Sequence, residues 1–385
     1  ETINYGATII SLANPDIRWE QTRQTDIGLE AGFLKDRLSL EVDYYHKYTD
    51  GILVQAPIPA YVGASNIPYV NAASVINRGF DFNVSWDQTV SGFHYTVGVV
   101  ASTVHNEVDK LGQGQDAIFA GGTGEGGKLA TRTVVGGPIG AFYGYKVVGV
   151  FQSQDEITQY NDQAVAAAKQ NGTYDPNKTY TYEPGAVPGD LIFQDTDGDG
   201  TITSTDRTYI GSPIPSFIYG VHLSASYKGF DFSVTTSGQT GNKIYNAKKT
   251  ARFGTPNFET SYLDRWNGQG TSNSEPRLTN GGMNYNVSTR FLEDGAYFTI
   301  RNIQLGYNLP RSLTQQVNVR GIKVYLNVEN LVTFTKYSGY TPQISGSTIS
   351  ENGIGQTSTN VLDSGIDHGV YPIARTFSVG VNIRF

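Results

Sequence analysis

Residues 23–48 read RQTDIGLEAGFLKDRLSLEVDYYHKY, and this stretch decides the fold. Apolar residues occupy every second position, first from Ile27 to Phe33 and then from Leu38 to Tyr44. Strict alternation of apolar and polar residues is typical of a β-strand with one apolar and one polar face. The intervening Lys35-Asp36 predicts a short turn. We therefore expect two antiparallel strands joined by a hairpin.

The same period of two recurs along the rest of the chain. It is found at 80–86, 93–101, 217–227, 230–234, 303–309, 322–328 and 377–385. Strands with one apolar face build either a sandwich, with the apolar faces inward, or a membrane barrel, with the apolar faces outward. Many of these segments reach about ten residues, the length that a tilted strand needs to cross a bilayer. Acids and amides on the polar faces suit a wet lumen, so we expect an all-β, transmembrane antiparallel β-barrel.

Composition excludes several other classes of protein. Only 16% of the 385 residues are charged, whereas 12% are aromatic and 45 are Gly, which disfavours a helical bundle. No apolar run approaches the ~18 residues of a transmembrane helix. The absence of Cys excludes a disulfide scaffold and thiolate metal sites. A net charge of −7 argues against nucleic acid as a partner.

The predicted strands can be counted by alternating their direction. The ranges are 23–34, 37–48, 75–87, 92–107, 128–135, 140–151, 216–227, 230–238, 296–309, 321–330 and 374–385. Lys128–Val135 is included because 92–107 and 140–151 would otherwise be neighbours that run the same way. Since single-chain bacterial barrels have an even number of strands, about eleven strands predict that 1–385 is the C-terminal part of a barrel of about 22. Short connections alternate with long ones, of which 152–215 is a predicted long extracellular loop.

Several phrases resemble the SusC/RagA-like TonB-dependent transporters of Gram-negative outer membranes. They are Asn14–Glu20 (NPDIRWE), Gly137–Gly140 (GPIG), Pro188–Asp190 (PGD), Ile303–Pro310 (IQLGYNLP), Asn327–Leu331 (NVENL) and Tyr337–Pro342 (YSGYTP). Their order and spacing cover essentially the whole chain. Thr341 departs from the pattern, since Asp is expected there. Nothing in the sequence resembles the family's plug, TonB box or first strands.

The resemblance implies a function and a set of partners. It implies uptake of oligosaccharides or peptides across the outer membrane, a SusD-like surface lipoprotein, and energy from the TonB complex through the N-terminal part that this sequence lacks. Outer-membrane lipid would surround the barrel, and a dimer of transporter–lipoprotein pairs is a further expectation. The last strand resembles the signal that the barrel-assembly machinery reads. Its outward residues are Phe377, Val379, Val381, Ile383 and Phe385.

Asp195 to Asp206 match the calcium loop of an EF-hand. Ca²⁺ prefers six to eight hard oxygen ligands, and alternating Asp residues bring such ligands together as the chain wraps around the ion. Gly200 stands at the sixth position, which needs a sharp turn. The expected ligands are Asp195, Asp197, Asp199, Thr201, Thr203 and Asp206. No helical pattern flanks the loop, so we predict a structural Ca²⁺ site.

No motif predicts an enzyme. The five His residues form no H-x-x-x-H pair, and no G-x-S-x-G elbow occurs. For substrate contact, Asp264 and Trp266 offer a carboxylate and an aromatic platform of the kind that binds sugars. Two other functions stay open at this point: a structural or adhesive outer-membrane β-protein that transports nothing, and a secreted calcium-binding β-sandwich module.

Overall fold

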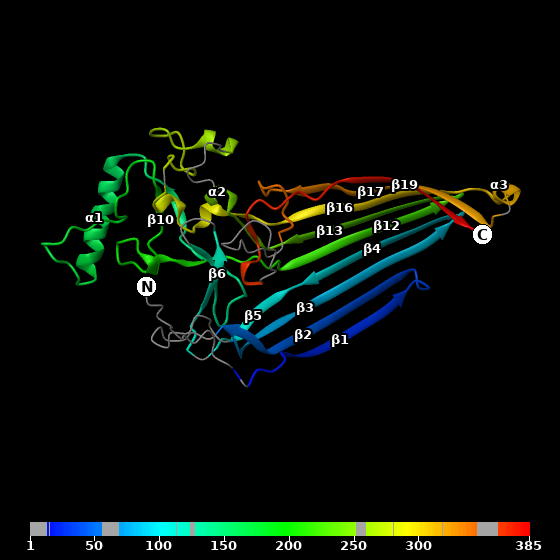
Figure 1. The fold of residues 1–385 in the computed structure, drawn as a ribbon, viewed down its shortest axis with the longest axis horizontal. Coiled ribbons are helices and arrows are strands. Elements are labelled where there is room, and N and C mark those ends of the chain that lie inside the picture. Colours follow the sequence, from blue (N-terminus) through cyan, green and yellow to red (C-terminus); the bar gives the residue numbers. More distant parts are fainter. Residues whose placement is uncertain are drawn as a thin grey trace, which may run out of the picture.

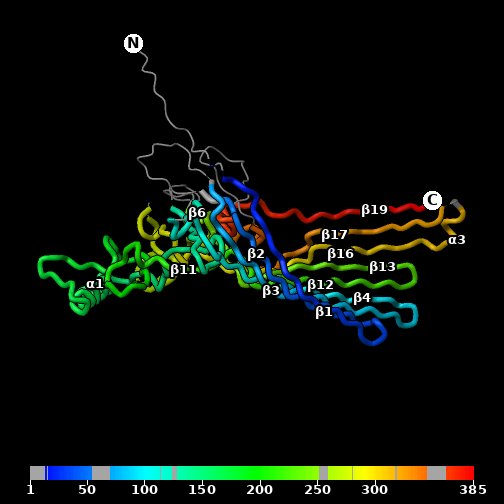
Figure 2. Tube along the Cα trace, turned by 90° about the horizontal axis from the view of Figure 1, so that it is seen from below, coloured from blue at the N-terminus to red at the C-terminus, as the bar shows by residue number. Residues whose placement is uncertain are grey.

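One large antiparallel sheet dominates the protein (Figure 1). The computed structural model describes residues 14, 16–55, 69–112, 114–123, 128–251, 259–279, 281–317, 319–344 and 361–385. The strands of the sheet, in spatial order, are β1 (Gln21–Phe33), β2 (Leu38–Gln55), β3 (Tyr69–Val90), β4 (Phe93–Thr103), β12 (Phe217–Tyr227), β13 (Phe230–Thr240), β16 (Tyr297–Asn308), β17 (Gly321–Thr335) and β19 (Thr376–Arg384). A short strand, β5 (His105–Lys110), extends the pairing of β3. The described sheet is open, with β1 and β19 at its edges (Figure 2).

The register gives the sheet two chemically different faces. One row of paired residues crosses all nine long strands and is apolar throughout: Phe33, Leu38, Trp86, Val97, Leu223, Val234, Ile303, Val328 and Phe377. The next row lies on the opposite face and is small or polar: Gly32, Ser39, Ser85, Gly98, His222, Thr235, Asn302, Glu329 and Thr376. The apolar face is exposed, with Leu29, Val379 and Phe385 each more than half accessible. Period-two alternation therefore does produce a sheet with an apolar outer face.

Short and long connections lie at opposite ends of the sheet. We call these the turn end and the loop end. At the turn end, two-residue turns join β3 to β4 at Ser91-Gly92 and β12 to β13 at Lys228-Gly229. Both residues of each turn have positive φ, the geometry that matches strand twist in tight hairpins. The β16–β17 connection at this end carries α3 (Arg311–Thr314) and η6 (Gln315–Val317), beside the C-terminus in Figure 1.

The segments at the loop end fold into a separate body, which we call the loop body. Its helices are α1 (Gln154–Gln170), α2 (Lys248–Ala251), η2 (Ser204–Asp206), η3 (Thr260–Asp264), η4 (Met283–Tyr285), η5 (Thr289–Phe291) and η7 (Val361–Asp363). Its strands are β6 (Ile118–Gly122), β7 (Leu129–Thr133), β8 (Phe142–Gly144), β9 (Val147–Val150), β10 (Leu191–Phe193), β11 (Thr208–Gly211), β14 (Lys243–Asn246), β15 (Leu292–Asp294) and β18 (Ile366–Asp367). They form three small sheets, β11-β8-β7-β6, β10-β9 and β15-β14-β18.

Two hydrophobic clusters hold the loop body together. The first core lies under α1 and includes Phe151, Ile157, Leu191 and Phe193. α1 begins at Gln154 because the Ser153 side chain accepts a hydrogen bond from Glu156 N, and it turns Ile157, Ala164 and Ala168 toward this core. The second core contains Ala130, Phe142, Tyr245, Ala247, Tyr285, Val287, Phe291 and Ile366. The two hydrophobic clusters thus lie in the loop body, whereas the large sheet exposes its apolar face.

The assignment of two of the eleven predicted strands to the barrel was wrong. Lys128–Val135 and 140–151 lie in the loop body and not in the large sheet. There β7 pairs with β6 and β8, and β9 pairs with β10. Instead β4 pairs directly with β12, and Val104 N donates to Ser216 O at the base of the intervening segment. The predicted loop 152–215 is therefore the second half of a longer excursion. Alternation identified these segments as strands but could not say which sheet they join.

Among the described residues, no helix is long and apolar enough to cross a membrane. No second sheet covers the apolar face of the large sheet in the described part of the chain. The sandwich alternative requires such a cover, so the described residues do not support it.

Candidate functional site

The Asp-rich loop lies between β10 and β11 and packs against α1. Oxygen atoms of Asp195, Asp197 and Asp199 lie within 4.8 Å of one another. Gly200 has φ +86°, and a Cβ there would lie 2.9 Å from the Cα of Ala164, so glycine is needed both for the turn and for the helix contact. Three of the six predicted calcium ligands are thus brought together, and their hard oxygens are of the type that Ca²⁺ binds.

Asp206 has a different local role from the one that the EF-hand pattern assigns. It is fully buried, and its carboxylate accepts hydrogen bonds from Thr196 N (2.8 Å) and Thr203 N (2.7 Å). Burial raises the pKa of Asp206 in spite of these bonds. The Thr203 hydroxyl lies 2.7 Å from that of Thr205, and Thr201 N donates to Asp199. Asp206 therefore braces the loop from inside, and the exposed Thr203 bonds to it through its backbone amide.

Trp266 is a packed residue of the loop body. Its indole Nε1 donates to Gln152 Oε1 (3.2 Å), and its ring lies against Gly189, where a Cβ would come within 2.4 Å of the ring. Gly189 N in turn donates to Phe151 O, next to the first core. Asp264 is exposed at the end of η3. The structure thus gives Trp266 a clear packing role, and substrate contact by either residue stays a prediction.

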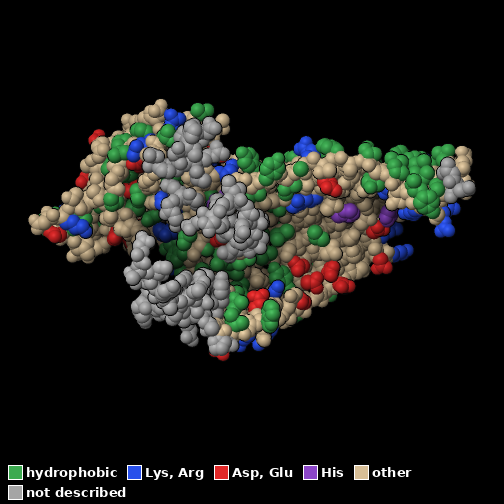
Figure 3. Space-filling view, viewed as in Figure 1, with side chains coloured by type: hydrophobic (Ala, Val, Ile, Leu, Met, Phe, Trp, Pro, Cys, Tyr) green, Lys and Arg blue, Asp and Glu red, His purple; other side chains and the backbone are tan. Residues whose placement is uncertain are grey.

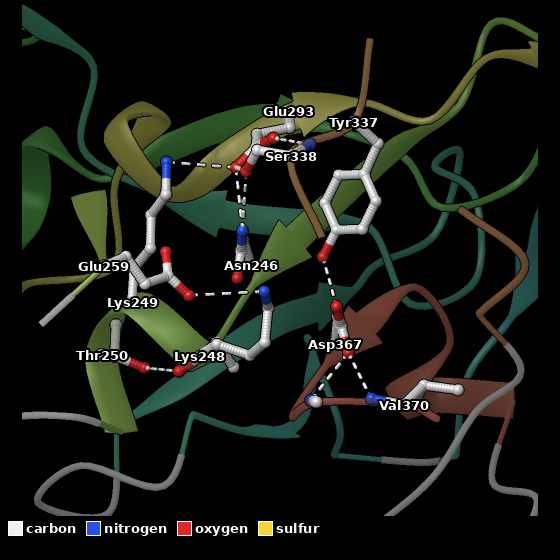
Figure 4. A network of polar contacts seen from close by, with 12 residues as sticks. Asn246, Lys248, Lys249, Thr250, Glu259, Glu293, Tyr337, Ser338, Asp367 and Val370 are labelled. Atoms are coloured by element: carbon white, nitrogen blue, oxygen red, sulfur yellow. Dashed lines mark hydrogen bonds and ion pairs between the residues drawn. The ribbon is translucent and has the colours of Figure 1, made fainter. Parts of the chain in front are cut away.

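A largely buried polar network joins four segments of the loop body (Figure 4). Asp367 is fully buried and accepts hydrogen bonds from Tyr337 Oη and from the backbone amides of Gly369 and Val370. Burial, reinforced by the bond to Asp367, raises the pKa of the Tyr337 hydroxyl. These contacts tie the segment after β17 to the segment before β19.

The second half of the same network ties β14 to β15. Glu293 forms an ion pair with Lys249 (3.1 Å) and accepts hydrogen bonds from Asn246 (2.9 Å) and Ser338 (2.8 Å). Burial opposes ionisation of Glu293, but these partners lower its pKa overall. Lys248 pairs with Glu259 at 3.4 Å. Sequence reasoning missed this network, because its members come from four segments far apart in the chain.

Several acids lie on the polar face of the large sheet. Glu41, Asp43 and Asp81 line a cavity of about 460 Å³ together with Asn83 and Ser102. Acidic side chains gather over this part of the sheet in Figure 3. The sequence predicts that acids on the polar faces of the strands line a wet lumen, and the position of Glu41 and Asp43 on this face agrees with that expectation.

The predicted assembly signal forms the edge strand β19. Phe377, Val379, Val381, Ile383 and Phe385 are all exposed, with Val379 72% and Phe385 84% accessible. They continue the apolar face of the sheet, since Val328 pairs with Phe377 and Leu326 with Val379. The geometry suits an outward-facing terminal strand, and recognition by the assembly machinery stays a prediction.

Comparisons with known proteins agree with this two-faced sheet. The family model described as "TonB dependent receptor-like, beta-barrel" matches residues 2–187. TonB-dependent receptor P3 of Formosa agariphila is 30% identical over 99% of this chain. Residues 2–187 thus match the β-barrel of the TonB-dependent receptor family. The family predicted from the sequence phrases is therefore confirmed.

Other relatives and solved structures that are similar to the chain carry the names SusC and RagAB. TonB-dependent receptor SusC of Bacteroides thetaiotaomicron is 25% identical over 99% of the chain. The structure of the RagAB peptide transporter superposes on 97% of the chain with a TM-score of 0.70 at 23% identity, and this similarity shows the fold. The chain spans about a third of the length of these relatives, 36% of P3, 34% of SusC and 36% of the solved RagAB chain.

Proposed function

We propose that this chain forms part of an outer-membrane transporter that imports oligosaccharides or peptides. The observation that carries the proposal is the unbroken apolar row across nine antiparallel strands, with a polar row beside it on the opposite face. Such a sheet places its apolar face in lipid and its polar face along a wet passage. The role is transport, without an enzymatic step.

The proposed partners follow from the relatives. SusC and the RagAB peptide transporter are named as a TonB-dependent receptor and a peptide transporter, which supports import and a dependence on the TonB complex. We propose a SusD-like lipoprotein as the surface partner, and a dimer of transporter–lipoprotein pairs as the assembly. We also propose that the barrel-assembly machinery recognises β19, and that outer-membrane lipid of a Gram-negative cell contacts the apolar face.

A pull-down of the native protein in mild detergent, with mass spectrometry of the bound material, tests the proposal. A stoichiometric surface lipoprotein, together with uptake that stops when TonB is deleted, is the expected result. A protein repeatedly recovered alone, with uptake unchanged by TonB deletion, would instead favour the structural or adhesive alternative.

We propose Ca²⁺ as a structural ion of the Asp-rich loop. The three clustered carboxylates and the braced backbone around Asp206 support this role, because bound Ca²⁺ would offset the repulsion among Asp195, Asp197 and Asp199. Chelation with EGTA should speed proteolysis of the loop body, and added Ca²⁺ but not Mg²⁺ should reverse the effect. Asp197→Asn should abolish this response, whereas the control Asp162→Asn, on the exposed side of α1, should keep it. Equal proteolysis with and without Ca²⁺ in the native protein would exclude the ion.

We retain Asp264 and Trp266 as proposed substrate contacts, with a test that separates contact from packing. Asp264→Asn leaves the shape of this exposed site unchanged and should weaken substrate binding if the carboxylate takes part. Trp266→Phe keeps an aromatic ring against Gly189 but removes the bond to Gln152. Unchanged substrate affinity in Asp264→Asn, with altered loop stability in Trp266→Phe, would leave these residues a structural role only.

A further inference from the structure

Arginine and aromatic side chains cluster on one face of the small sheet β11-β8-β7-β6. Phe142 of β8 is completely buried in the second core, so its neighbour Tyr143 points to the opposite face. Phe119 of β6 pairs with Arg132 of β7, and Tyr143 pairs with Tyr209 of β11. Phe119 and Tyr209 are 47% and 52% accessible. This face therefore presents an open aromatic surface, which we call the arginine platform.

Arg132 lies over two aromatic rings at the centre of the arginine platform. Its guanidinium carbon lies 4.6 Å from the centre of the Tyr143 ring and 5.7 Å from that of Phe119. Arg207 also contacts the Tyr143 ring, at 4.9 Å. The Arg207 guanidinium donates to the backbone oxygens of Leu129 (3.2 Å) and Tyr143 (3.0 Å), which fixes its own position. Two positive charges are thus concentrated around one ring.

Neither positive charge is balanced by an ion pair with a described residue. The side chain of Arg132 donates no hydrogen bond to the described protein, and its Nε is buried without a partner. By contrast, Arg277 and Arg290 of the same loop body pair with Asp190 at 2.7 Å and Glu275 at 3.1 Å. Arg132 is therefore a fixed, planar donor group without an acceptor.

The arginine platform belongs to the part of the loop body on the polar side of the large sheet. Ile139 N, in the segment between β7 and β8, donates to the Asn106 side chain (2.9 Å). Asn106 in turn donates to the side chain of Asn77 (2.8 Å), which shares the polar face of β3 with Asp81. These hydrogen bonds join the segment beside the arginine platform to the polar face of the large sheet.

We propose that the arginine platform binds a carboxylate of the transported ligand. A planar guanidinium matches a carboxylate in a two-pronged hydrogen bond, and exposed aromatic rings contact the apolar face of a sugar ring or a side chain. The inference rests on the proposed import function and adds a substrate class to it. A carboxylate can come from a uronic acid of a glycan or from the carboxyl terminus of a peptide, and the experiment separates these two sources.

Binding to the native protein in detergent is measured with two matched pairs of probes. Trigalacturonate is compared with neutral maltotriose, and trialanine with trialanine amide. The expected result is that the carboxylate member binds more tightly in one pair, and that this pair identifies the source. Arg132→Gln should lower its affinity by about 10- to 100-fold and should leave the affinity of the member without a carboxylate unchanged.

Two further variants separate charge, shape and folding. Arg132→Lys keeps the charge but loses the planar fork, so its affinity should fall between those of the native protein and Arg132→Gln. The control Arg311→Gln removes an exposed arginine of α3 at the turn end, far from the arginine platform in Figure 1, and should bind as the native protein does. An unchanged pattern of limited proteolysis shows that a variant is folded.

Several outcomes would overturn the inference. They are equal affinity for both members of each pair in the native protein, unchanged discrimination in Arg132→Gln, and an equal loss in Arg311→Gln. TonB-dependent uptake and a bound lipoprotein without any carboxylate preference would leave the proposed function standing and remove this inference alone. The opposite result is also distinguishable. If Arg132→Gln abolishes a carboxylate preference but the protein shows no TonB-dependent uptake, import is refuted and the binding site is retained.

Discussion

Glu183 should make the stability of the loop body depend on pH. Its side chain is 97% buried next to the first core, and neither carboxylate oxygen has a hydrogen-bond partner of normal geometry. Burial raises the pKa of Glu183 from 4.5 to about 8, a backbone amide at Phe193 opposes the shift, and the nearby Asp190 charge adds to it. The folded loop body therefore holds this carboxyl protonated at neutral pH.

The sign and size of the effect follow from these two pKa values. Between them, the folded state keeps a proton that the unfolded state has lost, so stability falls as pH rises and levels off above the folded pKa. With pKa values of 4.5 in the unfolded state and about 8 in the folded state, burial of Glu183 lowers the free energy of unfolding by about 0.8 kcal/mol at pH 5 and by about 3.3 kcal/mol at pH 7. The loop body should thus lose about 2.5 kcal/mol of local stability between those two pH values.

Hydrogen exchange of peptides that cover 180–193, corrected for intrinsic rates, measures this local stability. Glu183→Gln replaces the carboxyl with a neutral amide of similar shape. The difference between native protein and variant in the free energy of local opening should therefore grow by about 2.5 kcal/mol from pH 5 to pH 7. Glu20→Gln, at an exposed position outside the loop body, is the control and should show no such difference. A native-minus-variant difference that stays constant over this range would refute the reasoning.

Two further substitutions test the sheet and the buried network. Val379→Lys places a charge on the exposed apolar face and should lower the stability of the folded protein in the membrane by about 2–4 kcal/mol or prevent membrane assembly. Ser378→Lys places the same charge on the polar face and should be tolerated. Heat-modifiable migration of the folded barrel measures both variants, and equal behaviour of the two would contradict the assigned faces. Tyr337→Phe removes a hydrogen bond to buried Asp367 and should loosen the amides bonded to that carboxylate by about 1.5–3 kcal/mol in hydrogen exchange. Tyr371→Phe, at a site 86% exposed, should leave those amides unchanged, and an equal effect of both changes would disprove the proposed brace.

The large sheet could be predicted closely from the sequence because each strand carries its own signal. The range 23–34 became β1 at Gln21–Phe33, and 374–385 became β19 at Thr376–Arg384. Alternation shows which residues share a face, and it can be read without knowing which strand lies beside it. The choice of neighbour depends on contacts over long distances in sequence. That is why β7 and β9 were assigned to the wrong sheet.

The loop body was harder to predict because its contacts are specific to its tertiary structure. The EF-hand pattern located the Asp195–Asp199 cluster, but it could not show that Asp206 bonds to two backbone amides. Nothing local to Tyr337 or Asp367 indicates that they meet. The arginine platform was missed for the same reason, since Phe119, Arg132 and Tyr143 come from three strands and carry no motif.

The direct pairing of β4 with β12 makes the intervening excursion an exchangeable module. Thr103 pairs with Phe217, and Val104 N donates to Ser216 O, so the chain leaves and re-enters the sheet at neighbouring points. A different excursion could be joined at these residues without shifting the register between β4 and β12, provided that it supplies a strand in place of β5 and its own contacts to the other segments of the second core. Replacement of the excursion during evolution could therefore change what the protein recognises while the large sheet is retained. Chimeras joined at Thr103 and Ser216 would make the same exchange in an experiment.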